Sequence, residues 1–257
     1  MSSNDSIKKI ITVAFSLCIV CSVVVSTAAV LLKPAQQANR DLDRKRNILQ
    51  AAGLLEEGKG VEELFQRIQT RYVDLRTGEF AEDVPADYNQ QKASKNPQLS
   101  TNLSDDEDRA GIGRQAHFAE VYLVEAPGGD GLDKIILPVH GYGLWSTLYG
   151  FVALESDINT IAGLGFYEHG ETPGLGGEVD NPRWKAQWPG KKVYRDGEAA
   201  IALAKGSVDS SSPDAQWRVD GLSGATLTSR GVTDLVQFWL GEKGFKPFLN
   251  NLKTGDA

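Results

Sequence analysis

A run of small residues, 220–228, places a reactive hydroxyl where little shields it. The run reads Asp-Gly-Leu-Ser-Gly-Ala-Thr-Leu-Thr, and it sets the Thr226 hydroxyl among residues too small to shield it. Apolar residues follow at steps of three and four and end before Gly241, which predicts a helix. The first turn of a helix presents free N–H groups and a partial positive charge, which attract phosphate. The pattern therefore predicts a site where a phosphate-bearing group is held or esterified.

A helix cap is the simpler interpretation of the same residues. Thr228 or Ser229 has the side chain that usually caps a helix start. Short motifs also match by chance. Taken alone, the run favours the cap, and only the rest of the sequence shifts the balance towards a phosphate site.

A second segment, Glu171–Gly177, also has the composition of a ligand loop. Its glycines and proline break regular structure and let the backbone approach a flat ligand. Leu175 can lie against a ring face, and Thr172 can donate to a ring heteroatom. A plain turn would not need a leucine between glycines. The expected binding residues of this loop are Thr172, Gly174, Leu175 and Gly176.

Two weaker signals accompany these segments. Leu144 and Trp145 follow a glycine-rich turn, where a tryptophan is either a core residue or a ligand contact. Lys205 ends a short predicted strand, and it is either an ordinary surface lysine or an ammonium beside the phosphate.

Together, these motifs resemble those of a known family. Residues 220–226 resemble the flavinylation motif of FMN-binding proteins, and with 141–146, 171–176 and a single membrane span the chain resembles the C subunits of Na+-translocating NADH:quinone reductases. The resemblance implies one covalent FMN, joined through its phosphate to Thr226. It places the phosphate among Ser223, Gly224, Ala225, Leu227 and Thr228, and it places the ring near the Thr172–Gly176 loop, Leu144 and Trp145.

The same resemblance implies a role and partners. The chain is expected to relay electrons in a membrane complex that oxidises NADH, reduces ubiquinone and exports Na+, with the other subunits as partners. A flavin transferase that uses FAD and magnesium would attach the cofactor and read Asp220. The alternatives are an RNF-type electron-transport subunit with the same flavin, or a non-redox assembly or binding module. No Gly-x-Gly-x-x-Gly opens a helix after a strand, so no catalytic residue for substrate oxidation is expected.

Other chemistries are disfavoured by composition. The formal net charge of −7, without a basic stripe, argues against nucleic acid. His117, His140 and His169 lack metal-site spacing, so no metal site is predicted. Cys18 and Cys21 lie three apart in an apolar stretch, where cysteine usually acts as a small hydrophobe rather than a ligand.

Residues 10–32 carry no charge and predict a transmembrane helix. They are long enough for a hydrocarbon core of about 30 Å, and longer than the apolar core of about 7–15 residues in a cleaved signal peptide. The flanking charges leave the orientation open. The resemblance implies a single pass through a bacterial inner membrane, with a periplasmic domain.

The remainder predicts an α+β fold with a mostly antiparallel sheet and flanking helices. Short apolar runs at 118–125, 134–139, 148–154 and 160–167 are expected strands, and 193–194 and 200–204 are two further candidates. Val61, Leu64, Phe65 and Ile68 suggest a short helix, and residues 76–115 a surface excursion. The expected division is a cytoplasmic tail at 1–9, the membrane helix at 10–32, a helical and surface segment at 33–115, and the FMN-binding domain at 116–257.

Overall fold

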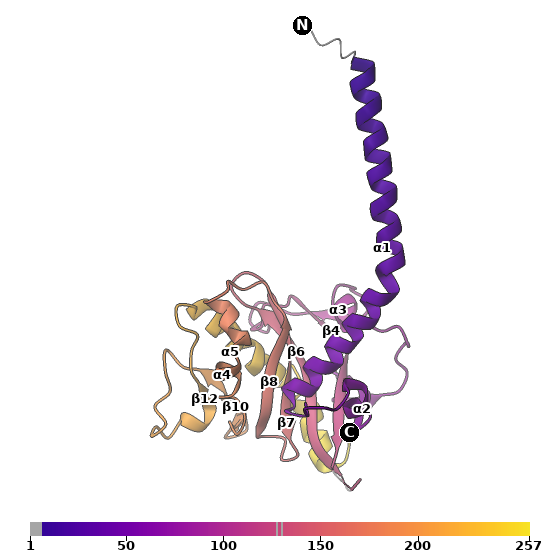
Figure 1. Ribbon diagram of the computed structural model, residues 1–257. Coiled ribbons are helices and arrows are strands. Elements are labelled where there is room, and N and C mark those ends of the chain that lie inside the picture. Colours follow the sequence, from indigo (N-terminus) through magenta and orange to yellow (C-terminus); the bar gives the residue numbers. More distant parts are fainter. Residues whose placement is uncertain (1–6, 127, 130) are drawn as a thin grey trace. The chain divides into compact units, whose positions relative to one another are not determined.

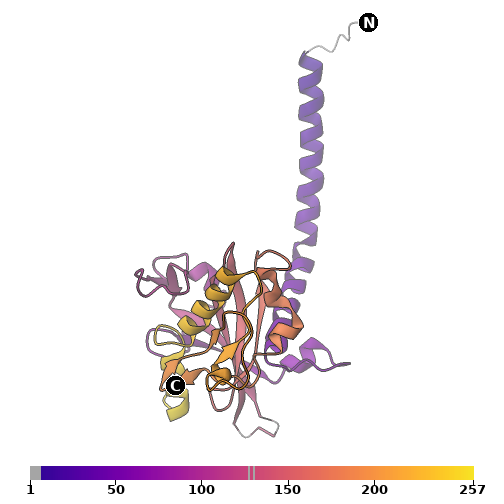
Figure 2. The same ribbon diagram turned by 90° about the vertical axis from the view of Figure 1, so that its left-hand side faces the viewer.

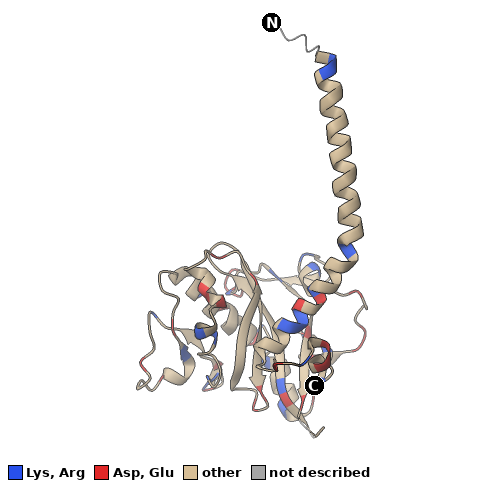
Figure 3. Cartoon of the chain, in the orientation of Figure 1, with Lys and Arg blue, Asp and Glu red and all other residues tan. Residues whose placement is uncertain are grey.

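The computed structural model describes residues 7–126, 128–129 and 131–257, so residues 1–6 of the expected tail lie outside the described residues. The chain divides into two compact units, the first ending at Arg44 and the second spanning Lys45–Ala257. Helix α1 (Ile7–Ala51) runs through the first unit into the second. Its most apolar window has a mean hydropathy of 2.5, and by length and composition it can cross a membrane. Figure 3 shows a long stretch of this helix without charged residues. In the sequence, the uncharged stretch lies between Lys9 and Lys33.

The second unit is built on a six-stranded sheet in which every neighbouring pair is antiparallel. Figure 1 shows its long strands side by side. From one edge to the other, the strands are β2 (Glu79–Ala81), β1 (Ile68–Asp74), β5 (Phe118–Glu125), β6 (Leu132–Tyr142), β7 (Thr147–Glu155) and β8 (Ile161–Glu168). The expected α+β class with a mostly antiparallel sheet is therefore confirmed.

Both faces of this sheet are covered, because its strands bury residues alternately on each side. On β5, Val121 packs into one core and Tyr122 into the other. The first core is closed by α5 (Thr226–Trp239) and α6 (Lys246–Thr254), and the second by α2 (Val61–Phe65) and the last turn of α1. Figures 1 and 2 show α5 and the end of α1 on opposite faces.

The shorter elements surround this framework. They are α3 (Gln90–Ala93), β3 (Ser100–Asn102), β4 (Arg114–Ala116), η1 (Gly176–Asp180), α4 (Pro182–Lys185), β9 (Tyr194–Arg195), β10 (Glu198–Ala199), β11 (Ala202–Leu203), η2 (Ala215–Trp217) and β12 (Arg218–Val219). The pair β11–β12 is parallel.

The four longer expected strands are all present, but the sheet also contains strands that the apolar pattern of the sequence did not predict. The short helix expected to include Ile68 ends at Phe65, and Ile68 instead opens β1. Ile68 packs against the second core while β1 pairs along its whole length with β5. Tertiary pairing therefore overrides a local pattern that a helix fits equally well.

Not all of the expected surface excursion lies at the surface. Leu103 and Ala110, from within 76–115, are buried in the first core. The four-part division of the chain stays a prediction.

Gly163 of β8 offers a test of how the end of α1 is packed. A Cβ at Gly163 would collide with the carbonyl oxygen of Ala51, whereas at Gly165 the nearest atom would be 4.0 Å away. We expect Gly163→Ala to lower the free energy of unfolding by about 1–3 kcal/mol, because the backbone there must shift. Gly165→Ala is the matched control and should cost much less.

Denaturant unfolding of the full-length chain, followed through the soluble unit, measures both variants. Equal stability of the two would contradict the close approach of Ala51 to β8.

Candidate functional site

Thr226 is the first residue of α5, and it is exposed. The residue before it, Ala225, makes no side-chain capping bond, so no side-chain oxygen of the cap competes for the first-turn N–H groups. The expected caps lie inside the helix instead. Thr228 is fully buried, and the Ser229 hydroxyl accepts a hydrogen bond from the N–H of Leu222 at 2.9 Å. The interpretation of Thr228 or Ser229 as N-cap is therefore wrong.

Gly224 brings the glycine-rich loop against this helix start. Its φ of +71° lies in the left-handed region, which glycine adopts readily. A Cβ here would lie 3.0 Å from Cδ2 of Leu175, so the two segments touch at this point. Leu175 precedes η1 and keeps 44% of its surface exposed beside that contact.

Glu171 links three segments through one buried carboxylate. Its Oε1 accepts hydrogen bonds from the N–H groups of Leu144 and Trp145 at 3.0 Å and of Ser146 at 3.3 Å. Its Oε2 accepts the hydroxyl hydrogen of Thr228 at 2.6 Å. The side chain thus joins the β6–β7 turn and the first turn of α5 to the loop that begins at Glu171.

Further bonds hold Glu171 in place. The Ser146 hydroxyl accepts the N–H of Gly170 at 2.6 Å. The N–H of Glu171 donates to Nδ1 of His169, whose Nε2 lies 2.8 Å from the Asp180 carboxylate. This arrangement requires the His169 tautomer that carries its proton on Nε2. The position of the Glu171 carboxylate is therefore set from both sides of the loop.

The Glu171 carboxyl is ionised at neutral pH despite its burial. Burial raises the pKa of this group, but the hydrogen bonds from Thr228 and from the N–H groups of residues 144–146 lower it further. The net result is a pKa below the ordinary glutamate value. Glu171 forms no ion pair with any residue that the structure describes. Its charge is therefore compensated by the dipoles of three N–H groups and of the Thr228 hydroxyl.

Two glycines make room for this carboxylate. A Cβ at Gly143 would lie 2.6 Å from Oε1 of Glu171, and a Cβ at Gly176 would lie 2.6 Å from both Oε2 and the Thr228 hydroxyl. A third glycine, Gly231 of α5, packs its Cα against the carbonyl of Tyr142. The helix and the β6–β7 turn can approach one another only because these side chains are absent.

Large apolar side chains stand exposed on the segments that Glu171 and Gly224 join. We call these four residues the apolar rim: Tyr142 (50% exposed), Trp145 (66%), Leu175 (44%) and Leu227 (56%). Single exposed hydrophobic residues are ordinary, but a group on converging segments marks a binding surface. Of the two interpretations of Trp145, the core one is wrong, because two-thirds of the side chain faces solvent.

The segment of Lys205 lies beside the start of the motif. The carbonyl of Gly206 accepts the N–H of Gly221 at 2.8 Å, and the Asp220 carboxylate accepts the N–H of Val208 at 2.7 Å. Lys205 itself is exposed. Asp220 therefore organises the loop that carries Lys205, a role that the sequence did not indicate.

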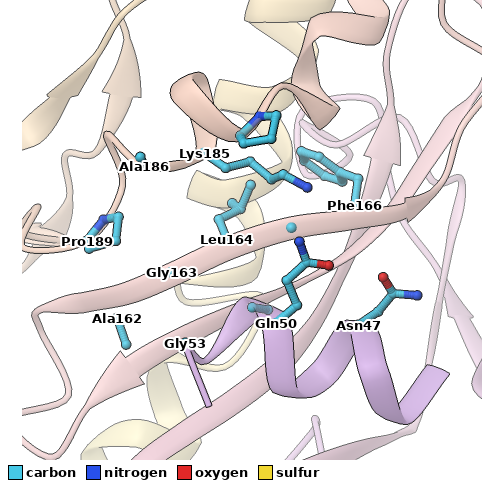
Figure 4. Close-up of a pocket in the computed structure, with 13 residues that line it drawn as sticks. Asn47, Gln50, Gly53, Ala162, Gly163, Leu164, Phe166, Lys185, Ala186 and Pro189 are labelled. Carbon is cyan, nitrogen blue, oxygen red and sulfur yellow. The ribbon is translucent and has the colours of Figure 1, made fainter. Parts of the chain in front are cut away.

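A separate hollow lies away from these residues. It has a volume of about 230 Å³ and is bounded by the end of α1, β8 and residues 182–189. Figure 4 shows Gln50 and Lys185 on opposite sides of it. None of the residues expected to bind the cofactor lines this hollow, so the chemistry of the chain points to the exposed surface around Thr226.

Comparison with known proteins identifies the family of this chain. The family model described as "FMN-binding domain" matches residues 143–241, which contain the β6–β7 turn, the Glu171 loop and α5. The C subunit of the Na(+)-translocating NADH-quinone reductase of Pseudomonas aeruginosa is 54% identical over 263 aligned residues, and the match covers 100% of both chains. The chain belongs to this C-subunit family.

Two further relatives support the assignment. The corresponding reductase component of Vibrio vulnificus is 51% identical over 99% of both chains. The crystal structure of Shewanella oneidensis NqrC superposes with a TM-score of 0.75 at 38% identity, over 82% of this chain and 97% of that one. The family resemblance inferred from the motifs is therefore confirmed.

The sequence did not reveal the residues that assemble the candidate site of this C-subunit family member. Glu171 belongs to one of the motifs, but its contacts with residues 144–146 and Thr228 are 25 to 57 positions apart along the chain. Its one available signal was being the only carboxylate in an otherwise uncharged glycine-rich loop. The expected binding residues of the three motifs do converge, whereas their individual cofactor contacts stay predictions.

Gly231 provides a test of this convergence, because the direction in which an alanine there changes the melting temperature reports whether the helix is closely packed. Replacing glycine by alanine inside a helix normally stabilises it by about 0.5–1 kcal/mol. In α5, the new Cβ would collide with the carbonyl of Tyr142. We therefore expect Gly231→Ala to lower the melting temperature of the soluble unit in the full-length chain.

Arg230→Ala, at the neighbouring and largely exposed position, is the control and should change stability little. A melting temperature raised by Gly231→Ala would contradict the close packing of α5 on the β6–β7 turn.

Proposed function

We propose that this chain is a membrane-anchored flavoprotein subunit that relays electrons through one FMN, phosphoester-linked to Thr226, in a complex that oxidises NADH, reduces ubiquinone and exports Na+. The carrying observation is the exposed Thr226 hydroxyl at the uncapped first turn of α5, inside the region that matches the FMN-binding family model. The names of the two reductase relatives support the reaction and the ion.

The residues around Thr226 fit a phosphate diester that joins the threonine to a flavin. First-turn N–H groups and the positive end of the helix dipole favour a negatively charged phosphoryl group. Ser223 and Gly224 are exposed beside Thr226, and Gly224 adds no side chain that would block approach. The Thr228 hydroxyl is already committed to Glu171, so its expected contribution reduces to its backbone N–H.

The surface beside Thr226 fits a flat heteroaromatic ring. The apolar rim offers Trp145, Leu175 and Leu227 as faces for the ring, while polar groups of the Thr172–Gly176 loop are available for its edge. Leu144 shapes the turn behind Trp145. A flavin held there accepts two electrons together and passes them on singly, which suits a relay. The protein residues hold, orient and partly desolvate it, and none of them oxidises substrate.

Attachment needs an enzyme in addition to this chain. Thr226 would supply the oxygen that bonds the FMN-side phosphorus of FAD, with AMP as the leaving group of the broken pyrophosphate bond and a base of the flavin transferase as the acceptor of the hydroxyl proton. Magnesium would balance the charge of the pyrophosphate. Asp220 lies six residues from Thr226 and is partly exposed, which keeps it available for recognition by that enzyme.

The membrane assignment rests on α1. Its uncharged stretch at 10–32 would span a bacterial inner membrane once, with residues 116–257 as the FMN-binding domain on the periplasmic side and the other reductase subunits as partners. The side chains of this stretch offer no acidic or basic group for an ion path, so Na+ would cross through those subunits.

Thr226→Val removes the hydroxyl and keeps the shape of the side chain. From cells that contain the flavin transferase, we expect the wild-type chain to carry one covalent FMN in intact-mass spectra and to fluoresce on a denaturing gel. The variant should lose both signals completely, because no ester can form.

The control is Thr101→Val, which alters another exposed threonine, on β3, and should retain the flavin. A wild-type chain without covalent FMN would overturn the proposal in favour of a non-redox assembly module. Flavin retained in Thr226→Val would assign the attachment to another residue.

A further inference from the structure

Glu171 is the only buried acidic side chain among the described residues, and its carboxylate hydrogen-bonds both the β6–β7 turn and the first turn of α5. Only 5% of its surface is exposed, and it carries no ion-pair partner among the described residues. A buried charge is costly unless it is fully hydrogen-bonded. Three N–H groups and one hydroxyl satisfy it here, so four hydrogen bonds from two distant segments converge on this one buried charge.

The hydrogen bonds of this carboxylate fix the orientation of two segments of the site. It turns the N–H groups of residues 144–146 inward, which leaves Trp145 pointing out as part of the apolar rim. It also anchors α5 two residues after Thr226, through the Thr228 hydroxyl. Through these bonds one side chain ties the turn that carries Trp145 to the helix start that carries Thr226, beside the close backbone contact of Gly231 with Tyr142.

The same group is a fixed negative charge beneath that surface. N–H dipoles compensate the charge only in part, and the surrounding interior screens it poorly compared with water. A negative charge near a redox group disfavours the addition of an electron. Glu171 therefore has a means of lowering the reduction potential of a group bound on the apolar rim.

We propose that Glu171 is a positioning residue of the site, which locks the Leu144–Ser146 turn to the first turn of α5 and whose carboxylate lowers the reduction potential of the bound flavin. The second half of this proposal rests on the proposed function, whereas the first half concerns the protein alone. The two halves are therefore tested on different forms of the full-length chain.

The first test uses the chain produced without the flavin transferase, in detergent. In Glu171→Gln, the amide carbonyl remains a weaker, neutral acceptor for the three N–H groups, and the NH2 group can only donate to the Thr228 hydroxyl oxygen, so every charge-assisted bond of the carboxylate is lost. We expect the amides of residues 144–146 to exchange with deuterium about tenfold faster than in the wild type. Glu168→Gln removes the same charge from the exposed end of β8 and should leave this exchange unchanged.

A second pair of variants covers the case in which Glu171→Gln does not fold. Thr228→Val removes only the bond to Oε2 and should also speed exchange at residues 144–146, to a smaller extent. Thr228→Ser restores the hydroxyl and should return exchange towards the wild-type rate. Wild-type exchange at residues 144–146 in Glu171→Gln would overturn the positioning role, and where that variant does not fold, wild-type exchange in Thr228→Val would overturn it.

The third test uses the flavinylated chain and a redox titration followed by flavin absorbance. Glu171→Gln should move the midpoint potential to more positive values. Thr228→Val keeps the charge and Glu168→Gln removes an exposed, solvent-screened one, so both should shift the potential less. An unchanged potential in a flavin-loaded Glu171→Gln chain would overturn the electrostatic role.

The experiments distinguish a failure of the proposed flavoprotein function from a failure of the proposed positioning role of Glu171. If the wild-type chain carries no covalent FMN, the proposed function and the effect on the potential both fail. The exchange measurements on the flavin-free chain still decide whether Glu171 locks the two turns.

Discussion

One buried carboxylate determines how the functional end of this protein is assembled. Glu171 sits at the start of a loop that has little regular structure, and its two oxygens are shared between a β-turn and a helix that are far apart in the chain. Without that bridge, the N–H groups of residues 144–146 and the Thr228 hydroxyl would lose their hydrogen-bond partner. With it, the turn that carries the exposed Trp145 is tied to the helix start that carries the exposed Thr226.

Several sequence features that look independent follow from this constraint. Gly143 and Gly176 lack side chains because a Cβ at either would occupy the space of the carboxylate. Gly231 is tolerated in a helix interior because α5 must approach the Tyr142 carbonyl. Their cost in chain entropy is offset by the close approach they allow. A glycine-rich motif that suggests close approach of a ligand thus also contains glycines that are needed for close packing within the protein.

The sheet supplies the rigidity on which this surface depends. Covering both of its faces, with α5 on one and the last turn of α1 on the other, immobilises β6, β7 and β8, whose ends carry the turn and the loop. The helix that is apolar enough for a membrane therefore continues into the structural core of the soluble unit. Its final residues, Ile48 and Leu49, are fully buried there.

The sequence by itself determined the strongly periodic elements and the family, and it singled out Thr226 as the candidate hydroxyl. Strands from Phe118 to Tyr167 and the apolar face of α5 are local patterns, and the motif around Thr226 is contiguous, so neighbours in the chain carry the information. It did not determine the place of β1 in the sheet, because Ile68 fits a helix or a strand locally and only its pairing with β5 decides. Nor did it determine the role of Glu171, the true start of α5 or the exposure of Trp145. Those depend on which distant segments fold together, and only the tertiary structure decides where a buried charge finds its hydrogen bonds.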